Sequence, residues 1–170
     1  PEVYRQIIDF AKAHDIVIIH DNAYSDIVFD TKEPGGSFLA YEGAREVGVE
    51  FLSLSKSFDV TGVRLSFLVG RPDIVAAAKK LHGQLDYGMF FPEQDVAIAA
   101  LTGPLDGVER QRMLYQERRD ALCDALEGIG WERPNAHGSM FVWARIPGGR
   151  MDSVDFTLEL MEKSGVIVTP

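Results

Sequence analysis

Lys56 ends a short apolar segment, residues 51–55, and has the small hydroxyl residues Ser53 and Ser55 just before it. In a partly enclosed site the pKa of a lysine falls, and only the neutral amine can attack a carbonyl carbon and form a Schiff base. The alternative is a surface lysine whose aliphatic chain packs on the protein while its ammonium group reaches solvent. The residue types therefore indicate either a covalent attachment point or an ordinary exposed lysine.

Two further groups of polar residues adjoin apolar segments. Asp21 and Tyr24 follow the β-branched run 16–19, and a carboxylate and a phenol at this spacing could hold an aromatic nitrogen heterocycle at two points. The alternative is that Asp21 favours a turn and that the Tyr24 ring packs. Gly62 permits a tight backbone, and the planar fork of Arg64 suits a dianionic phosphate. An arginine at the exposed start of a strand is again the ordinary alternative.

Strands must position these residues. The run 16–19 is apolar on both faces, which is typical of a buried strand in a parallel sheet covered by helices. Each of the three polar groups adjoins a predicted strand end, where ligands bind in α/β sheets. The pattern of apolar residues predicts the following elements in chain order: helix 1–15, strand 16–19, strand 51–55, strand 65–69, helix 73–85, helix 94–101, helix 106–126, strand 140–146, helix 153–163 and a strand from Val166. This order of strands and helices indicates an α/β fold.

The composition excludes several classes of function. The chain has 170 residues, of which 46% are hydrophobic and 25% charged, so we expect a globular protein. A net charge of −9 disfavours sequence-independent binding to nucleic acid or to an anionic membrane, since both need a positive field. No apolar run is long enough to span a bilayer. The single cysteine, Cys123, excludes an internal disulfide and a cysteine zinc site, and it fits the reducing cytoplasm.

The joint spacing of the polar groups resembles a known cofactor site. A D-x-x-Y pattern runs from Asp21 to Tyr24, and the pattern S-x-S-K-x-x-x-x-x-G-x-R runs from Ser53 to Arg64. Together they resemble the pyridoxal-phosphate (PLP) site of the class I/II aminotransferases of fold type I, and the resemblance extends over essentially the whole chain. Segment 86–94 is also similar to the branch that contains LL-diaminopimelate aminotransferase-like enzymes.

The resemblance implies a role for each residue of the two patterns. Lys56 would form a Schiff base with the aldehyde of pyridoxal 5'-phosphate and would later move a proton between the substrate and the cofactor. Asp21 would accept a hydrogen bond from the pyridinium nitrogen, which keeps the ring an electron sink. Tyr24 would donate a hydrogen bond to the 3′ oxygen. The residues that would hold the phosphate are Ser53, Ser55 and Arg64. No metal ligand is implied.

The resemblance also implies a partial aspartate aminotransferase-like fold. Residues 1–85 would be the C-terminal part of the PLP-binding large domain, 86–105 an interdomain and dimer-interface segment, and 106–170 an incomplete C-terminal small domain. Family features that would precede Asp21, and the arginine for the substrate carboxylate, are missing from the sequence. We therefore expect the chain to be the C-terminal half of an aminotransferase and to have no useful activity alone.

Two positions outside these patterns, Ser66 and Arg145, also bear on the resemblance. The family usually has a glycine where this sequence has Ser66, and a Cβ is easily accommodated at the start of a strand. Arg145 is a tempting partner for a substrate carboxylate, but by alignment with the family it precedes that position. We expect Arg145 to be an exposed strand residue.

The predicted function is PLP-dependent transfer of an amino group between an amino acid and a 2-oxo acid, in a cytoplasmic homodimer without nucleic-acid or membrane partners. A PLP-dependent C–S lyase of the same fold would use the same Asp21, Tyr24, Lys56 and Arg64. A PLP-binding sensor domain of an aminotransferase-like transcription regulator would bind the cofactor without turnover. Because a fold hosts many functions, these alternatives remain open.

Overall fold

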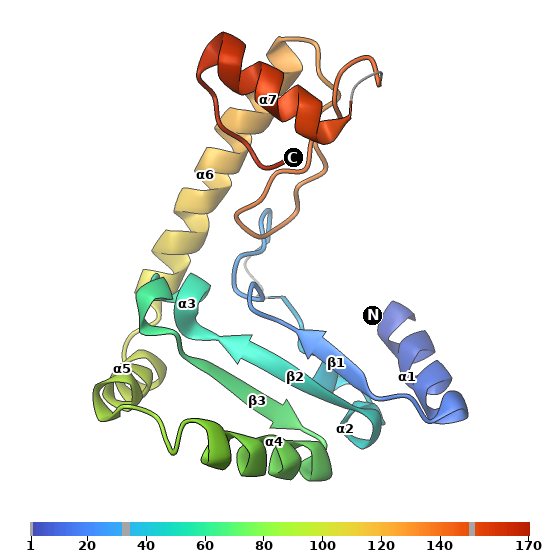
Figure 1. The fold of residues 1–170 in the computed structure, drawn as a ribbon, viewed down its shortest axis with the longest axis vertical. Helices are drawn as coiled ribbons and strands as arrows, with labels where there is room; N and C mark the ends of the chain where they lie inside the picture. The colour runs from blue at the N-terminus through green and yellow to red at the C-terminus, as the bar shows by residue number, and fades with distance from the viewer. Residues whose placement is uncertain (1, 32–34, 150–151) are drawn as a thin grey trace. The chain divides into compact units, whose positions relative to one another are not determined.

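The computed structural model describes residues 2–31, 35–149 and 152–170. Contacts divide the chain into two compact units, one of Pro1–Gln116 with His137–Ser139 and one of Glu117–Ala136 with Met140–Pro170. Figure 1 labels the principal helices and strands. In chain order the elements are α1 (Glu2–His14), β1 (Ile18–Asp21), the 3₁₀ helix η1 (Phe38–Ala40), α2 (Ala44–Val47), β2 (Gly48–Ser53), α3 (Leu54–Ser57), the 3₁₀ helix η2 (Thr61–Val63), β3 (Ser66–Gly70), α4 (Pro72–Leu85), α5 (Phe91–Thr102), α6 (Asp106–Gly128) and α7 (Ser153–Ser164).

The first unit is built on a three-stranded sheet in the order β1-β2-β3. β1 is parallel to β2, with Asp21 opposite Phe51. β3 is antiparallel to β2, with Ser53 opposite Ser66. Figure 1 shows the arrows of β1 and β2 pointing the same way and that of β3 reversed. The predicted α/β class is confirmed, and the carboxyl ends of β1 and β2 lie at the same edge of the sheet.

The first strand differs from its prediction in position and in burial. It begins at Ile18 rather than Ile16 and ends at Asp21. The expectation of a strand buried on both faces is wrong, because the side chains of Ile16, Val17 and Ile19 are 41%, 43% and 66% exposed. β1 is the edge strand of this sheet, and only the face that carries Ile18 is covered by the hydrophobic cluster around α1.

One hydrophobic cluster covers that face of the sheet. A Cβ at Gly48 would lie 2.7 Å from the Phe38 ring and 2.9 Å from the Ile18 carbonyl oxygen, so glycine is needed where the strand meets the cluster. The partly buried side chains of Tyr4, Ile18 and Tyr41 pack against it. Its buried members come from α1, η1 and α2: Ile8, Ala11, Phe38, Leu39, Ala44 and Val47.

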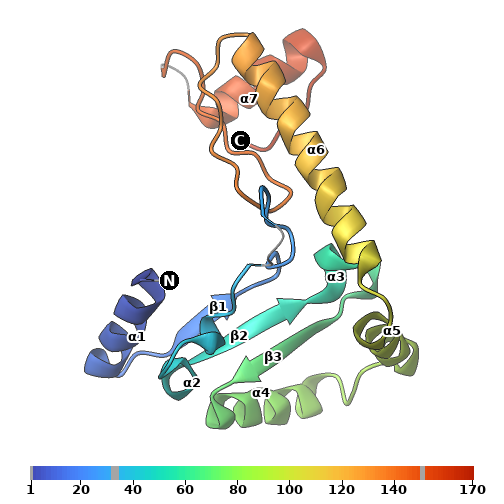
Figure 2. The same ribbon diagram turned by 180° about the vertical axis from the view of Figure 1, so that it is seen from behind.

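A second cluster lies beyond the carboxyl end of β2. Its buried members, Leu54, Leu65 and Ala97, join α3, the start of β3 and α5. The predicted helix 94–101 lies within α5, and the predicted helix 73–85 agrees with α4. Figure 2 shows α4 running along β3 from the opposite side of the molecule. The helices thus hold the end of β2, where the lysine pattern lies.

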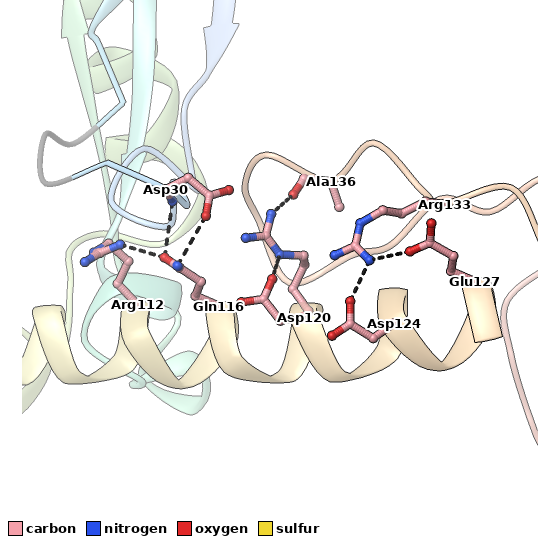
Figure 3. Close-up of polar contacts among 9 residues, drawn as sticks. Asp30, Arg112, Gln116, Asp120, Asp124, Glu127, Arg133 and Ala136 are labelled. Atoms are coloured by element: carbon pink, nitrogen blue, oxygen red, sulfur yellow. Dashed lines mark hydrogen bonds and ion pairs between the residues drawn. The ribbon is translucent and has the colours of Figure 1, made fainter.

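The second unit contains the C-terminal part of α6 and all of α7. Arg133 donates to Asp124 across 2.5 Å and to Glu127 across 2.9 Å, which ties the chain after α6 back onto the helix (Figure 3). The Trp131 and Phe156 rings meet edge to face, with centroids 5.9 Å apart. The predicted helices 106–126 and 153–163 are confirmed as α6 and α7.

Two predicted strands of this unit are not formed. Residues 140–146 and 166–170 have neither helical nor strand structure. Exposure nevertheless alternates along 140–146, with the Phe141 and Trp143 side chains 64% and 92% exposed. The exposure therefore alternates as it does along a strand, but a strand also needs a hydrogen-bonded neighbour. The described residues provide none for either segment. In the described part of the chain, no helix is long and apolar enough to cross a membrane.

Candidate active site

The first polar group lies where β1 ends. Asp21 is the last residue of the strand and is exposed. The Asn22 N–H donates to the Phe51 carbonyl oxygen across 2.9 Å, so the pairing with β2 continues one residue further. Tyr24 is half-buried in the turn that follows, and its carbonyl oxygen accepts from the Ile27 N–H at 3.0 Å. The predicted position of Asp21 at a strand end is confirmed.

The lysine pattern spans the end of β2 and a helical turn. Residues 51–55 were predicted to be a strand, but the strand stops at Ser53 and α3 begins at Leu54. The Ser53 Oγ accepts a hydrogen bond from the Ser55 N–H at 3.2 Å, a serine N-cap that explains why the backbone turns here. Ser55 is buried, and Lys56 is half-buried on the short helix. In the described part of the chain, no carboxylate forms an ion pair with Lys56.

Gly62 lies in the tight 3₁₀ turn of η2, as its small size permits, but the residue with a left-handed backbone is Arg64. Gly62 has an ordinary φ, and a Cβ there would have no described atom within 4 Å. Arg64 has φ 60° and ψ 43°, in the left-handed region that few non-glycine residues adopt. Its side chain is exposed, and Nη1 donates to the Thr61 carbonyl oxygen at 3.0 Å. The turn thus presents a guanidinium group on the surface beside α3.

Hydrogen bonds join the lysine segment to the arginine segment. The Thr61 hydroxyl donates to the Ser55 carbonyl oxygen at 3.0 Å. The Ser53 hydroxyl donates to the Leu65 carbonyl oxygen at 3.4 Å. Each contact links residues of the S-x-S-K run to the segment around Arg64, so the hydroxyl groups and the guanidinium group of the proposed phosphate site belong to one connected structure.

A third contact joins the lysine segment to the loop after β1. The Ser57 hydroxyl donates to Asp26 Oδ2 at 2.5 Å. Ser57 follows Lys56 on α3, and Asp26 lies two residues after Tyr24. The structure thereby connects all three polar groups at the carboxyl edge of β1 and β2.

The expectation for Ser66 holds, and that for Arg145 holds for its exposure but not for its place on a strand. Ser66 begins β3 opposite Ser53 and is exposed, so its Cβ is accommodated as predicted. The Arg145 side chain is 83% exposed, and Nη1 lies 3.9 Å from Glu132. It lies outside a regular strand, however, because residues 140–146 have no paired neighbour. An exposed pair of this kind contributes little to stability.

A buried carboxylate that was not among the predicted site residues lies beneath this edge. Glu50 on β2 is fully buried and accepts hydrogen bonds from the side chains of His20, Asn22 and Ser37 and from the Leu39 N–H. Burial alone would raise the pKa of Glu50, but these hydrogen bonds outweigh it and hold the pKa below its ordinary value of 4.5. The available signal was a single charged residue within the otherwise uncharged strand G-V-E-F-L-S.

The side chains at this edge fit pyridoxal phosphate by their chemistry. Ser53, Ser55 and Arg64 carry hydroxyl groups and a guanidinium group, which are donors that a phosphate dianion accepts from, and the Ser53 hydroxyl would have to turn from the Leu65 carbonyl oxygen to reach it. The same edge carries the Asp21 carboxylate for a protonated ring nitrogen and the half-buried Lys56 amine for an aldehyde. No cluster of potential metal ligands occurs among the described residues.

Comparison with known proteins places this edge in context. The family model "Aminotransferase class I and II" matches residues 1–170. An LL-diaminopimelate aminotransferase of Halothermothrix orenii is 43% identical over 169 residues, which cover 99% of this chain and 43% of the relative. A putative aminotransferase of Rhizobium meliloti is 40% identical over 171 residues, covering 99% of this chain and 42% of the relative. The chain thus spans less than half the length of these curated relatives.

Solved structures show the same fold. The apo-BacF structure from Bacillus subtilis superposes with a TM-score of 0.92 at 38% identity, covering 98% of this chain and 42% of that one. An aminotransferase from Staphylococcus aureus gives a TM-score of 0.91 at 36% identity, covering 99% of this chain and 44% of that one. The partial aspartate aminotransferase-like fold is therefore confirmed. Class I/II aminotransferases use pyridoxal phosphate. With its whole length matched by the family model, this chain belongs to the class I and II aminotransferases.

Proposed function

We propose that the intact protein transfers an amino group between an amino acid and a 2-oxo acid with pyridoxal phosphate as cofactor. The observation that carries this proposal is the hydrogen-bonded connection of the Asp21, Lys56 and Arg64 segments at one edge of the sheet, in a chain of the aminotransferase family. When bound, the cofactor supplies an electron sink for the bond cleavage at the amino acid Cα.

Each residue of the edge has a distinct task in this proposal. The Lys56 amine would hold the cofactor aldehyde covalently and would supply the group that moves a proton at the substrate Cα at high effective concentration. Asp21 would accept a hydrogen bond from the protonated ring nitrogen, and Tyr24 would donate to the ring oxygen. Ser53, Ser55 and Arg64 would hold the phosphate, for which the planar fork of Arg64 is suited.

Borohydride trapping tests the assignment of Lys56. The intact protein loaded with pyridoxal phosphate is reduced, digested and analysed by mass spectrometry. We expect the pyridoxyl group on Lys56 and none on Lys79, an exposed lysine of α4 that serves as an internal control. Lys56→Ala should lose the label while Lys79→Ala keeps it. A label on another lysine, or no label, would overturn the site.

The substrate class comes from the names of the relatives. Several of them are named LL-diaminopimelate aminotransferases, so LL-diaminopimelate is the first amino donor to assay, with 2-oxoglutarate as acceptor. The names favour transamination over the C–S lyase and sensor alternatives. Release of pyruvate and sulfide from cysteine without an oxo acid would instead support the lyase.

We also propose a homodimer and a cytoplasmic location. The aromatic side chains of Tyr87, Phe90 and Phe91 are 91%, 68% and 78% exposed, and exposed aromatic clusters are typical of protein interfaces. They lie in the segment 86–105 that we assign to the domain junction and the dimer interface, between large-domain residues 1–85 and small-domain residues 106–170. Sedimentation of the intact protein and its Phe91→Ser variant tests the dimer.

The proposed cytoplasmic location rests on the lone Cys123.

A further inference from the structure

Glu50 is a charged residue in the middle of β2, and its side chain is 0% exposed. Removing a carboxylate from water costs several kcal/mol unless hydrogen bonds compensate, and an apolar residue of similar volume is often at least as stabilising. Stability alone therefore does not account for a glutamate at this position. The geometry of its contacts gives a more specific reason.

The carboxylate oxygens of Glu50 accept four hydrogen bonds. Oε1 accepts from Asn22 Nδ2 at 2.9 Å. Oε2 accepts from the Ser37 hydroxyl at 2.8 Å, from His20 Nδ1 at 3.1 Å and from the Leu39 N–H at 3.4 Å. This arrangement requires the His20 proton on Nδ1. The group is fully hydrogen-bonded, in agreement with the lack of buried unpaired side-chain atoms among the described residues.

Two of these donors are the chain neighbours of Asp21. Successive side chains of a strand point to opposite faces of the sheet. Because His20 and Asn22 both point toward Glu50, the Asp21 side chain projects from the opposite face. His20 is held further by α1, because the Tyr4 hydroxyl lies 3.2 Å from its Nε2 and the two rings meet edge to face at 5.5 Å. Both neighbours of Asp21 are thereby fixed from the covered side of the sheet.

Asp21 has no comparable support of its own. Its side chain is exposed, and among the described residues no side chain or backbone group forms a hydrogen bond with its carboxylate. The direction of that carboxylate therefore depends on the backbone of residues 20–22. That backbone is held by the Asn22 N–H on the Phe51 carbonyl oxygen and by the two side chains that reach Glu50.

We propose that Glu50 is a positioning residue for Asp21, which holds both chain neighbours of Asp21 from beneath the sheet and so fixes the direction of its carboxylate. The inference rests on the proposed function, in which Asp21 accepts the hydrogen bond of the cofactor ring nitrogen. A carboxylate held in place before the cofactor arrives loses less freedom on binding.

The test compares variants of the intact protein that share one fold. Glu50→Gln keeps the shape of the side chain and removes its charge. The new amide N–H₂ group can then face the N–H₂ group of Asn22, so that two donors oppose each other unless the Asn22 side-chain amide flips. Asn22→Ala removes one of the two neighbour contacts and leaves the glutamate. The matched control is Glu46→Gln, an exposed carboxylate of α2 that pairs with Lys12 at 2.8 Å. Circular dichroism and urea unfolding establish that each variant folds.

Two measurements report on Asp21 rather than on overall structure. The first is the dissociation constant of pyridoxal phosphate, which we expect to rise about 10-fold or more in Glu50→Gln, less in Asn22→Ala and not in Glu46→Gln. Residues that orient metal ligands have effects of about this size. The second is the ¹⁵N chemical shift of the labelled cofactor ring nitrogen, which should move in Glu50→Gln toward the value in Asp21→Asn.

A double-mutant cycle decides whether Glu50 acts through Asp21. In an Asp21→Asn background, Glu50→Gln should change cofactor affinity by less than about 2-fold, because the group that it positions is already altered. Equal effects in both backgrounds, or an unmoved ¹⁵N shift, would overturn the positioning role while the proposed function stands. If Glu50→Gln does not fold, the same double-mutant cycle with Asp21→Asn is measured with Asn22→Ala in its place. A parent protein that binds no pyridoxal phosphate would overturn the proposed function and this inference with it.

Discussion

The Ser57 hydroxyl donates to Asp26 Oδ2 across 2.5 Å and thereby joins the helix that carries Lys56 to the loop that carries Tyr24. Ser57 is 3% exposed, and Asp26 is half-buried. A hydrogen bond to a charged group in such a place contributes about 1.5–3 kcal/mol, more than a neutral one on the surface. This hydrogen bond therefore holds the helix of Lys56 to the loop of Tyr24, although neither Lys56 nor Tyr24 takes part in it.

Ser57→Ala should lower the free energy of unfolding of the intact protein by about 1–3 kcal/mol, because it leaves the Asp26 carboxylate without its donor. Urea unfolding with an unchanged m-value measures the loss. The control is Ser66→Ala, an exposed serine at the start of β3, where we expect a change within about 0.5 kcal/mol. Equal losses in the two variants would show that the Ser57 contact carries no special stability.

Arg112 provides a second support, between α6 and the loop after β1. Its guanidinium group binds both Glu109 carboxylate oxygens, at 2.6 and 2.8 Å, and donates to the Val28 carbonyl oxygen at 3.3 Å. Figure 3 shows Arg112 beside Gln116, whose amide exchanges hydrogen bonds with Asp30. The side-chain hydrogen bonds from Arg112 to Glu109, and more weakly the nearby Asp30 charge, raise the pKa of Arg112.

Arg112→Lys should not substitute for this support, because an ammonium group lacks the planar fork that binds two oxygens at once. The arginine side chain is only 12% exposed, so we expect a loss of about 1–3 kcal/mol in the free energy of unfolding. Arg110→Lys is the matched control, since Arg110 is 73% exposed on the same helix. Comparable unfolding curves for the two variants would contradict the support that we assign to Arg112.

Much of the fold was predictable from local pattern. The helices α1, α4, α6 and α7 follow apolar periodicity, α5 was indicated by an apolar run, and the alternation of strands and helices around β1 to β3 indicated the α/β class. Where the prediction was wrong, hydrogen bonding decided, through a local cap in one case and a lack of a strand partner in the other. Leu54 and Ser55 have strand-like neighbours, yet the Ser53 cap turns them into a helix. Residues 140–146 keep the alternating exposure of a strand, and the described chain offers no partner to complete it.

The residues of the candidate site also divide into those that the sequence indicated and those that only the structure revealed. Asp21, Lys56 and Arg64 could be proposed from the spacing of the patterns that carry them, and their roles stay predictions. Glu50 and the Ser57–Asp26 pair could not be proposed, because each acts through contacts between residues far apart in sequence. Arg64 rather than Gly62 takes the left-handed backbone, a choice that depends on the turn between α3 and β3. Residue type alone favours the glycine.

Arg64→Lys should weaken binding of pyridoxal phosphate about 10- to 100-fold, because a paired hydrogen bond to the phosphate becomes a single one, a loss of about 1.5–3 kcal/mol. Equilibrium titration of the cofactor-free intact protein, followed by absorbance, measures the change. Arg71→Lys is the control: Arg71 pairs with Asp73 at 2.8 and 3.0 Å, and it lies outside the proposed cofactor residues. Equal affinity for pyridoxal phosphate in the Arg64 variant and its parent would show that Arg64 does not hold the phosphate.

The buried carboxylate predicts a particular response to acid. The pKa of Glu50 is lower in the folded protein than its ordinary value of 4.5, so the folded state prefers the ionised form more than the unfolded state does. The stability that this difference contributes is fully present above pH 4.5 and is lost as the pH falls through the lower, folded-state pKa. The groups that face Glu50 are His20, Asn22, Ser37 and the Leu39 N–H, with Tyr4 behind His20.

Glu50→Gln removes this ionisation and keeps the shape, so the difference in free energy of unfolding between the parent and the variant should shrink as the pH falls from 7 to below 4.5. Urea unfolding at intervals across that range measures the difference, and Glu46→Gln, which removes an exposed carboxylate of the same unit, gives the baseline to subtract. A difference that stays constant with pH would mean that the ionisation of Glu50 is not linked to folding. A difference that grows on acidification would mean that burial outweighs the hydrogen bonds and that the pKa of Glu50 is raised, the opposite of what its four donors indicate.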